Sequence, residues 1–131
     1  MSDKENIDLA YKMIEMHCAH TQGWVDACYH PKCEWIELAI SGQTKGRRGG
    51  IDTLRAAAME AARIFPSIKI VVSNIVSDGD RVALEIDFEG TMAKKEGVNK
   101  PARTSALKMA IFLTFQEGLI IRQVDYPVSV S

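Results

Sequence analysis

The carboxylate of Asp125 is the most informative chemical group in this 131-residue sequence. Alternate side chains of a strand point to the same side of a sheet, so Asp125 would share a face with Leu119, Ile121 and Gln123. If the two apolar residues face the core, the carboxylate faces it too. Burial raises the pKa of a carboxyl group and makes it a usable proton donor or acceptor near neutral pH. Alternatively, the strand ends before Asp125, which then caps the turn into Tyr126-Pro127.

Glu37 is a second candidate acid or base, in a predicted strand over residues 34–40. It shares one face of that strand with Trp35, opposite Ile36 and Leu38. Either face could be buried. Glu37 is therefore part of a site only if its face points inward, and it is a solvated carboxylate if that face points outward.

Metal and anion binding are the competing chemistries. Cys28, His30 and Cys33 lie close together, but no paired motif completes a four-ligand set, so we expect no metal site. The segment Lys45-Gly46-Arg47-Arg48-Gly49-Gly50 precedes a predicted helix and could bind an anion at the helix end. It lacks the Walker pattern, and a surface loop is the favoured interpretation.

Composition indicates one globular domain spanning residues 1–131, with 47% hydrophobic and 25% charged residues. No apolar run approaches the roughly 20 residues needed to cross a membrane. The polar, acidic start of the chain is not a signal peptide, so a cytoplasmic location is expected. A net charge of −1 argues against nucleic-acid binding.

The secondary structure expected to position these groups changes from mainly helices to strands along the chain. Helices are predicted over about residues 2–20, 24–29 and 51–65, the first opened by the capping-box pattern Ser2-Asp3-Lys4-Glu5. Its apolar stripe is Ile7, Ala10, Tyr11, Ile14 and Cys18. His17 lies near this stripe, where we expect a hydrogen-bonded core residue rather than a catalyst.

The second half of the sequence predicts strands, over residues 68–76, 81–91, 104–115 and 119–124. Helices followed by such a meander indicate an α+β fold, with helices packed on one face of a curved antiparallel sheet. The wholly apolar faces should point to the helices: Leu84, Ile86 and Phe88, with Leu107, Met109, Ile111, Leu113 and Phe115. The mixed faces should point to solvent or to a partner subunit.

The order of these pieces resembles the nuclear transport factor 2-like superfamily, and within it the SnoaL-like branch. The matching pieces, which cover nearly the whole chain, are the Trp24 helix ending at His30-Pro31, Cys33-Glu34-Trp35-Ile36-Glu37-Leu38, Gly49-Gly50-Ile51, Phe65-Pro66, Asp78-Gly79-Asp80-Arg81-Val82, Gly90-Thr91 and Gly118-Leu119-Ile120 through Asp125-Tyr126. The resemblance implies a cone-shaped, cystatin-like roll, in which the curved sheet wraps around three N-terminal helices and leaves an apolar pocket. Many members dimerise through the outer sheet face. A homodimer is therefore expected here, through an outer set of Ala83, Ala106, Ala110, Phe112 and Val124.

Family site residues carry over only in part. Asp125, seven residues after Gly118, matches the aspartate that SnoaL-like cyclases use as a general base. The epoxide hydrolases of the superfamily also have aspartate followed by tyrosine at this place. Trp35 and Glu37 fall where those hydrolases place tyrosine and asparagine to hold water, and near the base of the ketosteroid isomerases.

Other family positions hold residues that cannot do the same chemistry. The arginine and second aspartate of the hydrolases fall on Ile86 and Phe88, and the tyrosine and protonated acid of the isomerases fall on Met13 and Ile111. The histidine of some cyclases is Met92 here. The resemblance therefore argues against both isomerase and epoxide hydrolase chemistry of the usual kind.

The expected protein binds a small apolar or cyclic molecule and works without a cofactor. It is predicted to be an acid–base enzyme (isomerase, cyclase, dehydratase or hydrolase) with Asp125 and Glu37 as catalytic residues. The residues expected to bind the substrate are Trp35, Gln123, Met13, Ile86, Phe88, Met109 and Ile111. The alternative is a non-catalytic dimeric module that uses the same pocket only to bind a ligand or a partner.

Overall fold

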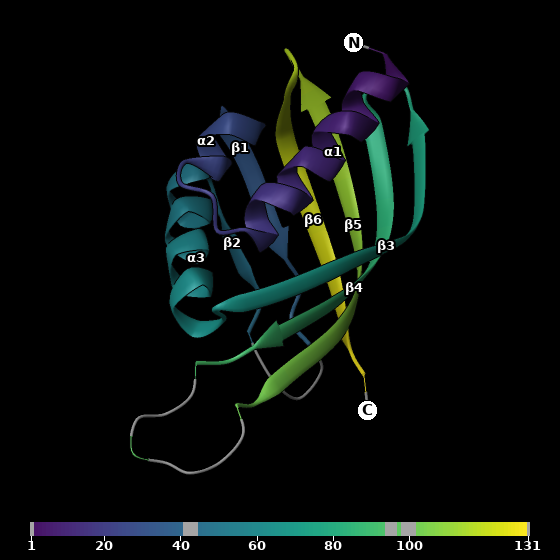
Figure 1. Ribbon diagram of the computed structural model, residues 1–131. Coiled ribbons are helices and arrows are strands. Elements are labelled where there is room, and N and C mark those ends of the chain that lie inside the picture. The colour runs from purple at the N-terminus through teal and green to yellow at the C-terminus, as the bar shows by residue number, and fades with distance from the viewer. Residues whose placement is uncertain (1, 41–44, 94–96, 98–101, 131) are drawn as a thin grey trace.

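The computed structural model describes residues 2–40, 45–93, 97 and 102–130, and in this part of the chain it has three helices and six strands. They are α1 (Asp3–Cys18), α2 (Trp24–Cys28), β1 (Tyr29–Glu37), β2 (Arg47–Gly49), α3 (Ile51–Ile64), β3 (Ser67–Asp78), β4 (Arg81–Thr91), β5 (Thr104–Gln116) and β6 (Leu119–Ser129). Figure 1 shows a strongly curved sheet with α1 and α3 on its concave side. The predicted α+β cone is confirmed.

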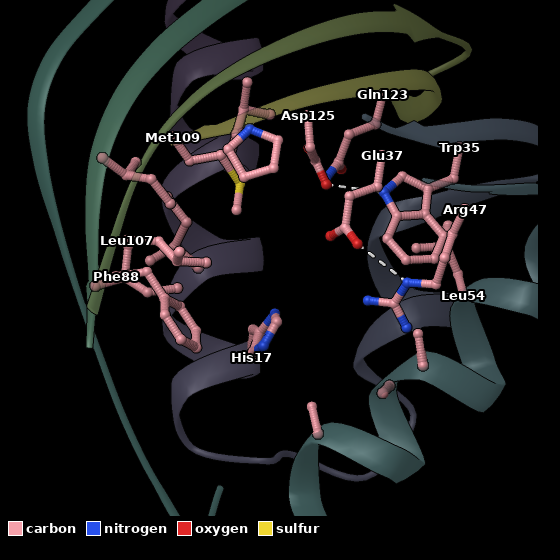
Figure 2. A pocket seen from close by; sticks show the side chains of 18 of the residues that line it. His17, Trp35, Glu37, Arg47, Leu54, Phe88, Leu107, Met109, Gln123 and Asp125 are labelled. Carbon is pink, nitrogen blue, oxygen red and sulfur yellow. Dashed lines mark hydrogen bonds and ion pairs between the residues drawn. The ribbon is translucent and has the colours of Figure 1, made fainter. Parts of the chain in front are cut away.

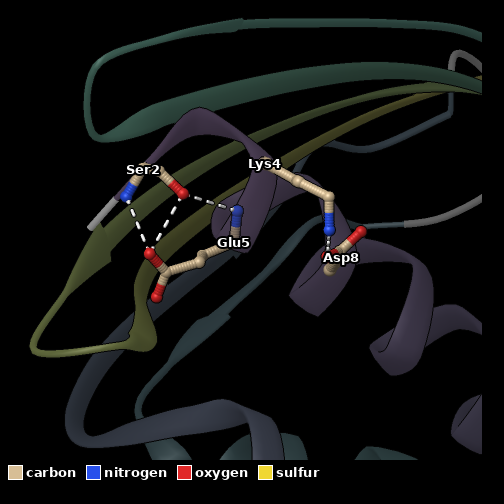
Figure 3. Close-up of polar contacts among 4 residues, drawn as sticks. All are labelled: Ser2, Lys4, Glu5 and Asp8. Atoms are coloured by element: carbon tan, nitrogen blue, oxygen red, sulfur yellow. Dashed lines mark hydrogen bonds and ion pairs between the residues drawn. The ribbon is translucent and has the colours of Figure 1, made fainter.

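The capping box predicted at the start of α1 is present. The Ser2 hydroxyl accepts a hydrogen bond from the backbone N–H of Glu5, and the Glu5 carboxylate accepts one from the backbone N–H of Ser2 (Figure 3). Lys4 and Asp8 add an exposed i,i+4 ion pair of 3.1 Å. Tyr11, predicted on the buried stripe, is instead 42% exposed.

The sheet has the order β2-β1-β6-β5-β4-β3. Neighbouring strands pair antiparallel except β1 and β6, which run parallel, so the sheet is mixed rather than wholly antiparallel. The parallel pair brings two distant parts of the sequence into one register, with Trp35 opposite Gln123 and Glu37 opposite Asp125. Strand direction depends on how the intervening chain crosses the fold, which residue types do not encode.

Strand β6 continues past Asp125 to Ser129, so the interpretation of Asp125 as a cap after the strand is wrong. A register shift interrupts the simple alternation: Thr114 pairs with Arg122, whereas Phe115 pairs with Ile120. Ile120 is therefore the fully buried core residue, and Ile121 is only half-buried. A bulge of this kind inserts one extra residue into a strand and leaves no mark on the order of apolar residues in the sequence. Strict alternation therefore placed Ile121 rather than Ile120 in the core.

The two faces of the sheet differ as predicted for most strands. The inner face supplies Leu84, Ile86, Ile111, Leu113 and Phe115 to the buried core beneath the helices. The outer face carries exposed apolar side chains on three strands, β3, β5 and β6: Val71, Val76, Phe112, Tyr126 and Val128. Of the described helices, none is long and apolar enough to span a membrane.

Candidate functional site

A cavity of about 510 Å³ lies between α1, α3 and the concave face of the sheet. Most of its lining is apolar, and Figure 2 shows the polar groups of Asp125, Gln123, Glu37, Arg47 and His17 among the side chains around it. The structure places all nine residues that we assigned to catalysis or substrate binding on its wall: Met13, Trp35, Glu37, Ile86, Phe88, Met109, Ile111, Gln123 and Asp125.

Asp125 is a buried carboxyl group on this wall, 4% exposed. The indole Nε1 of Trp35 donates to its Oδ2 over 2.9 Å, and the amide Nε2 of Gln123 donates to its Oδ1 over 2.9 Å. Burial raises the pKa of Asp125 to about 6, although both hydrogen bonds oppose this shift. In the part of the chain that is described, no cation forms an ion pair with it.

Tyr29 fixes the orientation of the Gln123 amide. Its hydroxyl donates a hydrogen bond to Oε1 of Gln123, which leaves the amide nitrogen to face Asp125. Tyr29 is almost fully buried, and burial together with the nearby Asp125 raises the pKa of its phenol well above the ordinary value. The phenol therefore stays protonated and keeps its role as donor at neutral pH.

Glu37 lies on the cavity wall as an ion pair with Arg47. The two residues face each other across β1 and β2, and Nε of Arg47 is 3.0 Å from Oε1 of Glu37. The guanidinium also lies 4.9 Å from the centre of the Trp35 ring, within cation–π range. The Glu37 carboxylate raises the pKa of Asp125 and Arg47 lowers it, both less than burial does.

The basic segment before α3, which we expected to be a surface loop, is partly a strand. Arg47–Gly49 forms β2, and residues 41–44, just before this segment, lie outside the described residues. Adjacent side chains of β2 reach opposite faces of the sheet, so Arg48 pairs with Glu34 at 2.8 Å on the outside. Arg122 binds the other oxygen of the same Glu34 carboxylate at 3.2 Å.

The cysteines and histidines do not assemble as ligands. Within residues 2–40, 45–93, 97 and 102–130, no three His, Cys, Asp or Glu side chains could together hold a metal ion. Cys28 and Cys33 are buried free thiols, and burial raises the pKa of both. His30 lies 3.9 Å from the exposed carboxylate of Glu117.

Among the wall residues that were not assigned to the site from the sequence, three matter most for its chemistry: Tyr29, Arg47 and His17. Tyr29 was assigned to the end of a helix, and Arg47 to a loop. His17 was expected to be a hydrogen-bonded core residue, but its ring lines the cavity. The available signal for Tyr29 was its aromatic, β-favouring side chain just before a strand-forming segment. Pro31 obscured that signal because proline is rare inside strands.

The fold and this cavity define a small-molecule-binding protein of the nuclear transport factor 2-like class. The SnoaL-like domain family matches residues 14–123, and the chain belongs to that family. No curated protein matches the sequence significantly.

Solved structures agree on the fold. AclR of Streptomyces galilaeus, a candidate hydroxylase, superposes with a TM-score of 0.77 at 17% identity, covering 96% of this chain and 80% of AclR. IdmH of Streptomyces antibioticus, a candidate polyketide cyclase, gives 0.75 at 17% identity, with 93% and 91% covered. A candidate SnoaL-like polyketide cyclase from Jannaschia gives 0.72 at 18% identity, with 95% and 86% covered. At such identities the likeness shows the fold alone.

Proposed function

We propose that the protein is an acid–base enzyme that moves a proton on a small, largely apolar or cyclic substrate bound in the cone cavity. The observation that carries this proposal is Asp125: a buried carboxyl group on an apolar wall, held on both oxygens by neutral donors and free of a paired cation among the described residues. The proposed proton transfer needs no cofactor.

In the proposed mechanism, Asp125 is the catalytic base. With a pKa of about 6 it is mostly ionised at neutral pH, yet basic enough to accept a proton. Trp35 and Gln123 each occupy one lone pair of the carboxylate, and the remaining lone pairs can take a proton from a substrate C–H or O–H. Asp125 then returns the proton elsewhere on the substrate. Such positioned proton transfer contributes about 10²–10⁴-fold acceleration.

Glu37 is proposed as the second acid or base. Its carboxylate lies on the same wall and is held by Arg47, so a proton could be delivered at a second point on the substrate. The descriptions of the structural neighbours as candidate cyclases and a candidate hydroxylase support a ring-bearing substrate. Isomerisation, cyclisation, dehydration and water addition all fit this arrangement.

The direct test is proton exchange on a probe ketone. We would incubate the protein with 2-tetralone in D₂O and follow loss of its α-proton signals by NMR, comparing wild type with Asp125→Asn. We expect exchange above the buffer rate for the wild type and the buffer rate for the variant, with matching circular dichroism spectra. Exchange that survives Asp125→Asn would overturn the assignment of the base.

The second candidate function is a non-catalytic binding module. One observation favours it: both oxygens of Asp125 already accept hydrogen bonds, as in a structural carboxylate. It predicts ligand binding that is equal in wild type and Asp125→Asn, and no exchange in either. A carbon-13 titration of the Asp125 carboxyl separates the two, since a structural carboxylate saturated by donors titrates at or below about 3.9.

We further propose a cytoplasmic homodimer that associates through the outer face of the sheet. The proposal is supported by the exposed fractions of Phe112 (52%) and Tyr126 (43%), whose rings contact each other edge-on on that face. Of the predicted outer set, Val124 is 5% exposed within the single chain, so it would add little to the contact. Light scattering tests the dimer, and a strictly monomeric mass would refute it.

A further inference from the structure

His17 is a polar side chain on the largely apolar wall of the cavity. It lies on α1, one turn after Met13, and Figure 2 shows its ring projecting from that helix into the cavity. Across the described residues, neither ring nitrogen has a hydrogen-bond partner. His20, three residues later on the chain, shows the contrast: its Nε2 is 2.7 Å from the backbone carbonyl of Phe65.

Among the described residues, the contact that holds the His17 ring in place is aromatic. Its centre lies 4.7 Å from that of Trp24, with 34° between the ring planes. Trp24 in turn meets Tyr29 edge-on at 6.1 Å. These aromatic contacts fix the imidazole against one wall, where the ring lines the cavity.

The imidazole is neutral at physiological pH. Burial, with a smaller effect from nearby His20, lowers the pKa of His17 to about 4. A neutral imidazole offers one N–H donor and one acceptor nitrogen. A polar group that borders an apolar cavity without a partner carries a free-energy cost, which a hydrogen bond to a ligand or to water removes.

We propose that the ring N–H of His17 donates a hydrogen bond to a neutral oxygen of the substrate, a ketone or hydroxyl carried on an apolar ring. Three carboxylates, Glu37, Glu60 and Asp125, line the cavity against two cations, Lys45 and Arg47, and Arg47 is already paired with Glu37. The excess of carboxylates disfavours a carboxylate substrate. This inference rests on the proposed function for its cavity and names the substrate class: a small cyclic ketone or alcohol.

The test compares two ligands that differ by one oxygen. Tetralin has the ring skeleton of 2-tetralone without the carbonyl, so the ratio of their dissociation constants isolates the recognition of that oxygen. We would measure both by titration calorimetry at pH 7.5. For the wild type we expect 2-tetralone to bind about tenfold more tightly, the value of one hydrogen bond of roughly 1–1.5 kcal/mol.

The variants show whether His17 is the donor. In His17→Phe the preference for the ketone should fall to about twofold or less, while tetralin binds as well as before. His17→Gln, which keeps an N–H donor, should restore part of the preference. Met16→Leu, a volume-conserving change beside His17 on α1 but outside the cavity wall, should leave the ratio unchanged. An undiminished ratio in His17→Phe, or a wild type that does not bind 2-tetralone or does not prefer it, would overturn the proposal.

A spectroscopic readout and the Asp125 variant complete the test. On adding 2-tetralone, the ring N–H signal of His17 should move downfield, and tetralin should not move it; an unmoved signal counts against the proposal. Asp125→Asn should lose proton exchange yet keep the ketone preference. If Asp125→Asn abolishes proton exchange but His17→Phe leaves the preference for 2-tetralone over tetralin unchanged, only this inference fails. If the preference holds and no exchange occurs, only the proposed catalysis fails.

Discussion

Trp35 donates a hydrogen bond of 2.9 Å to the buried carboxyl group of Asp125, although the two residues are 90 positions apart in the sequence. The contact runs diagonally across the parallel pair β1–β6, where Trp35 lies opposite Gln123 and Glu37 opposite Asp125. Burial and the indole act on the carboxyl in opposite directions: burial favours its neutral form and the indole favours its charged form. The pKa of about 6 is the balance of these effects, so substitutions that remove one of them should raise or lower it.

Asp125 should make the protein less stable as pH rises. Its pKa is raised from 3.8 to about 6 in the folded state, so between these values the folded protein binds more protons than the unfolded chain. The free energy of unfolding should therefore fall by on the order of 3 kcal/mol across this window and then level off. Urea unfolding from pH 3.5 to 7.5 measures this, and Asp125→Asn should lack this component. Asp52→Asn, at an exposed position, should keep the wild-type profile.

Trp35→Phe should raise the pKa of Asp125 further. The substitution keeps an aromatic ring but removes the indole N–H, the strongest of the groups that favour the charged carboxylate. A carbon-13 titration of the carboxyl measures the shift, with Asp125→Asn used to assign the signal. Trp24→Phe is the matched control, because Trp24 stacks on His17 and makes no hydrogen bond to Asp125. A pKa that is unchanged or lower in Trp35→Phe would contradict the assigned role.

Tyr29→Phe should destabilise the fold by about 1–3 kcal/mol, because it leaves the buried Oε1 of Gln123 without its donor. The variant keeps the ring and its contact with Trp24, so the loss reports on the hydroxyl. Chemical denaturation measures it. Tyr11→Phe, at a 42% exposed position, should change the free energy of unfolding by no more than about 0.5 kcal/mol. Equal effects of the two substitutions would show that the Tyr29 hydroxyl contributes nothing specific.

The Glu37–Arg47 pair should tune Asp125 in opposite directions. Glu37→Gln removes a negative charge and should lower the pKa of Asp125, whereas Arg47→Gln removes a positive charge and should raise it. Both should change stability by less than about 1 kcal/mol, since the pair is partly exposed. Glu34→Gln, in the equivalent pair on the outer face, should leave the carbon-13 titration of Asp125 unmoved. Shifts of the same sign in the first two variants would rule out a charge effect.

Local signals in the sequence predicted much of the fold correctly. The capping box at Ser2 and the break between the strands predicted over residues 68–76 and 81–91 define ends of elements through short-range chemistry, and both are present. The apolar face of β5 also points inward as alternation predicts, with Ile111 and Leu113 buried. These features depend on residues within a few positions of one another, which is why a single sequence is enough to read them.

The cavity wall depends on long-range pairing, and its details could not be predicted in the same way. The bulge at Ile121 changes the alternation without changing composition, and the short strand that carries Arg47 exists because β1 is there to pair with it. His17 was misread for another reason. A helical histidine near an apolar stripe has the same pattern whether a core or a cavity lies beyond it.

The parallel pairing of β1 with β6 also has a consequence for biosynthesis. Tyr29 and Trp35 leave the ribosome long before their partners Gln123 and Asp125, which follow about 90 residues later. Helices and hairpins can form during that interval, but the hydrogen bonds around the carboxyl cannot, since they need β6. The chemistry of the cavity is therefore assembled last. Until β6 docks, the nascent chain exposes one edge each of β1 and β5 to chaperones or to other copies of itself.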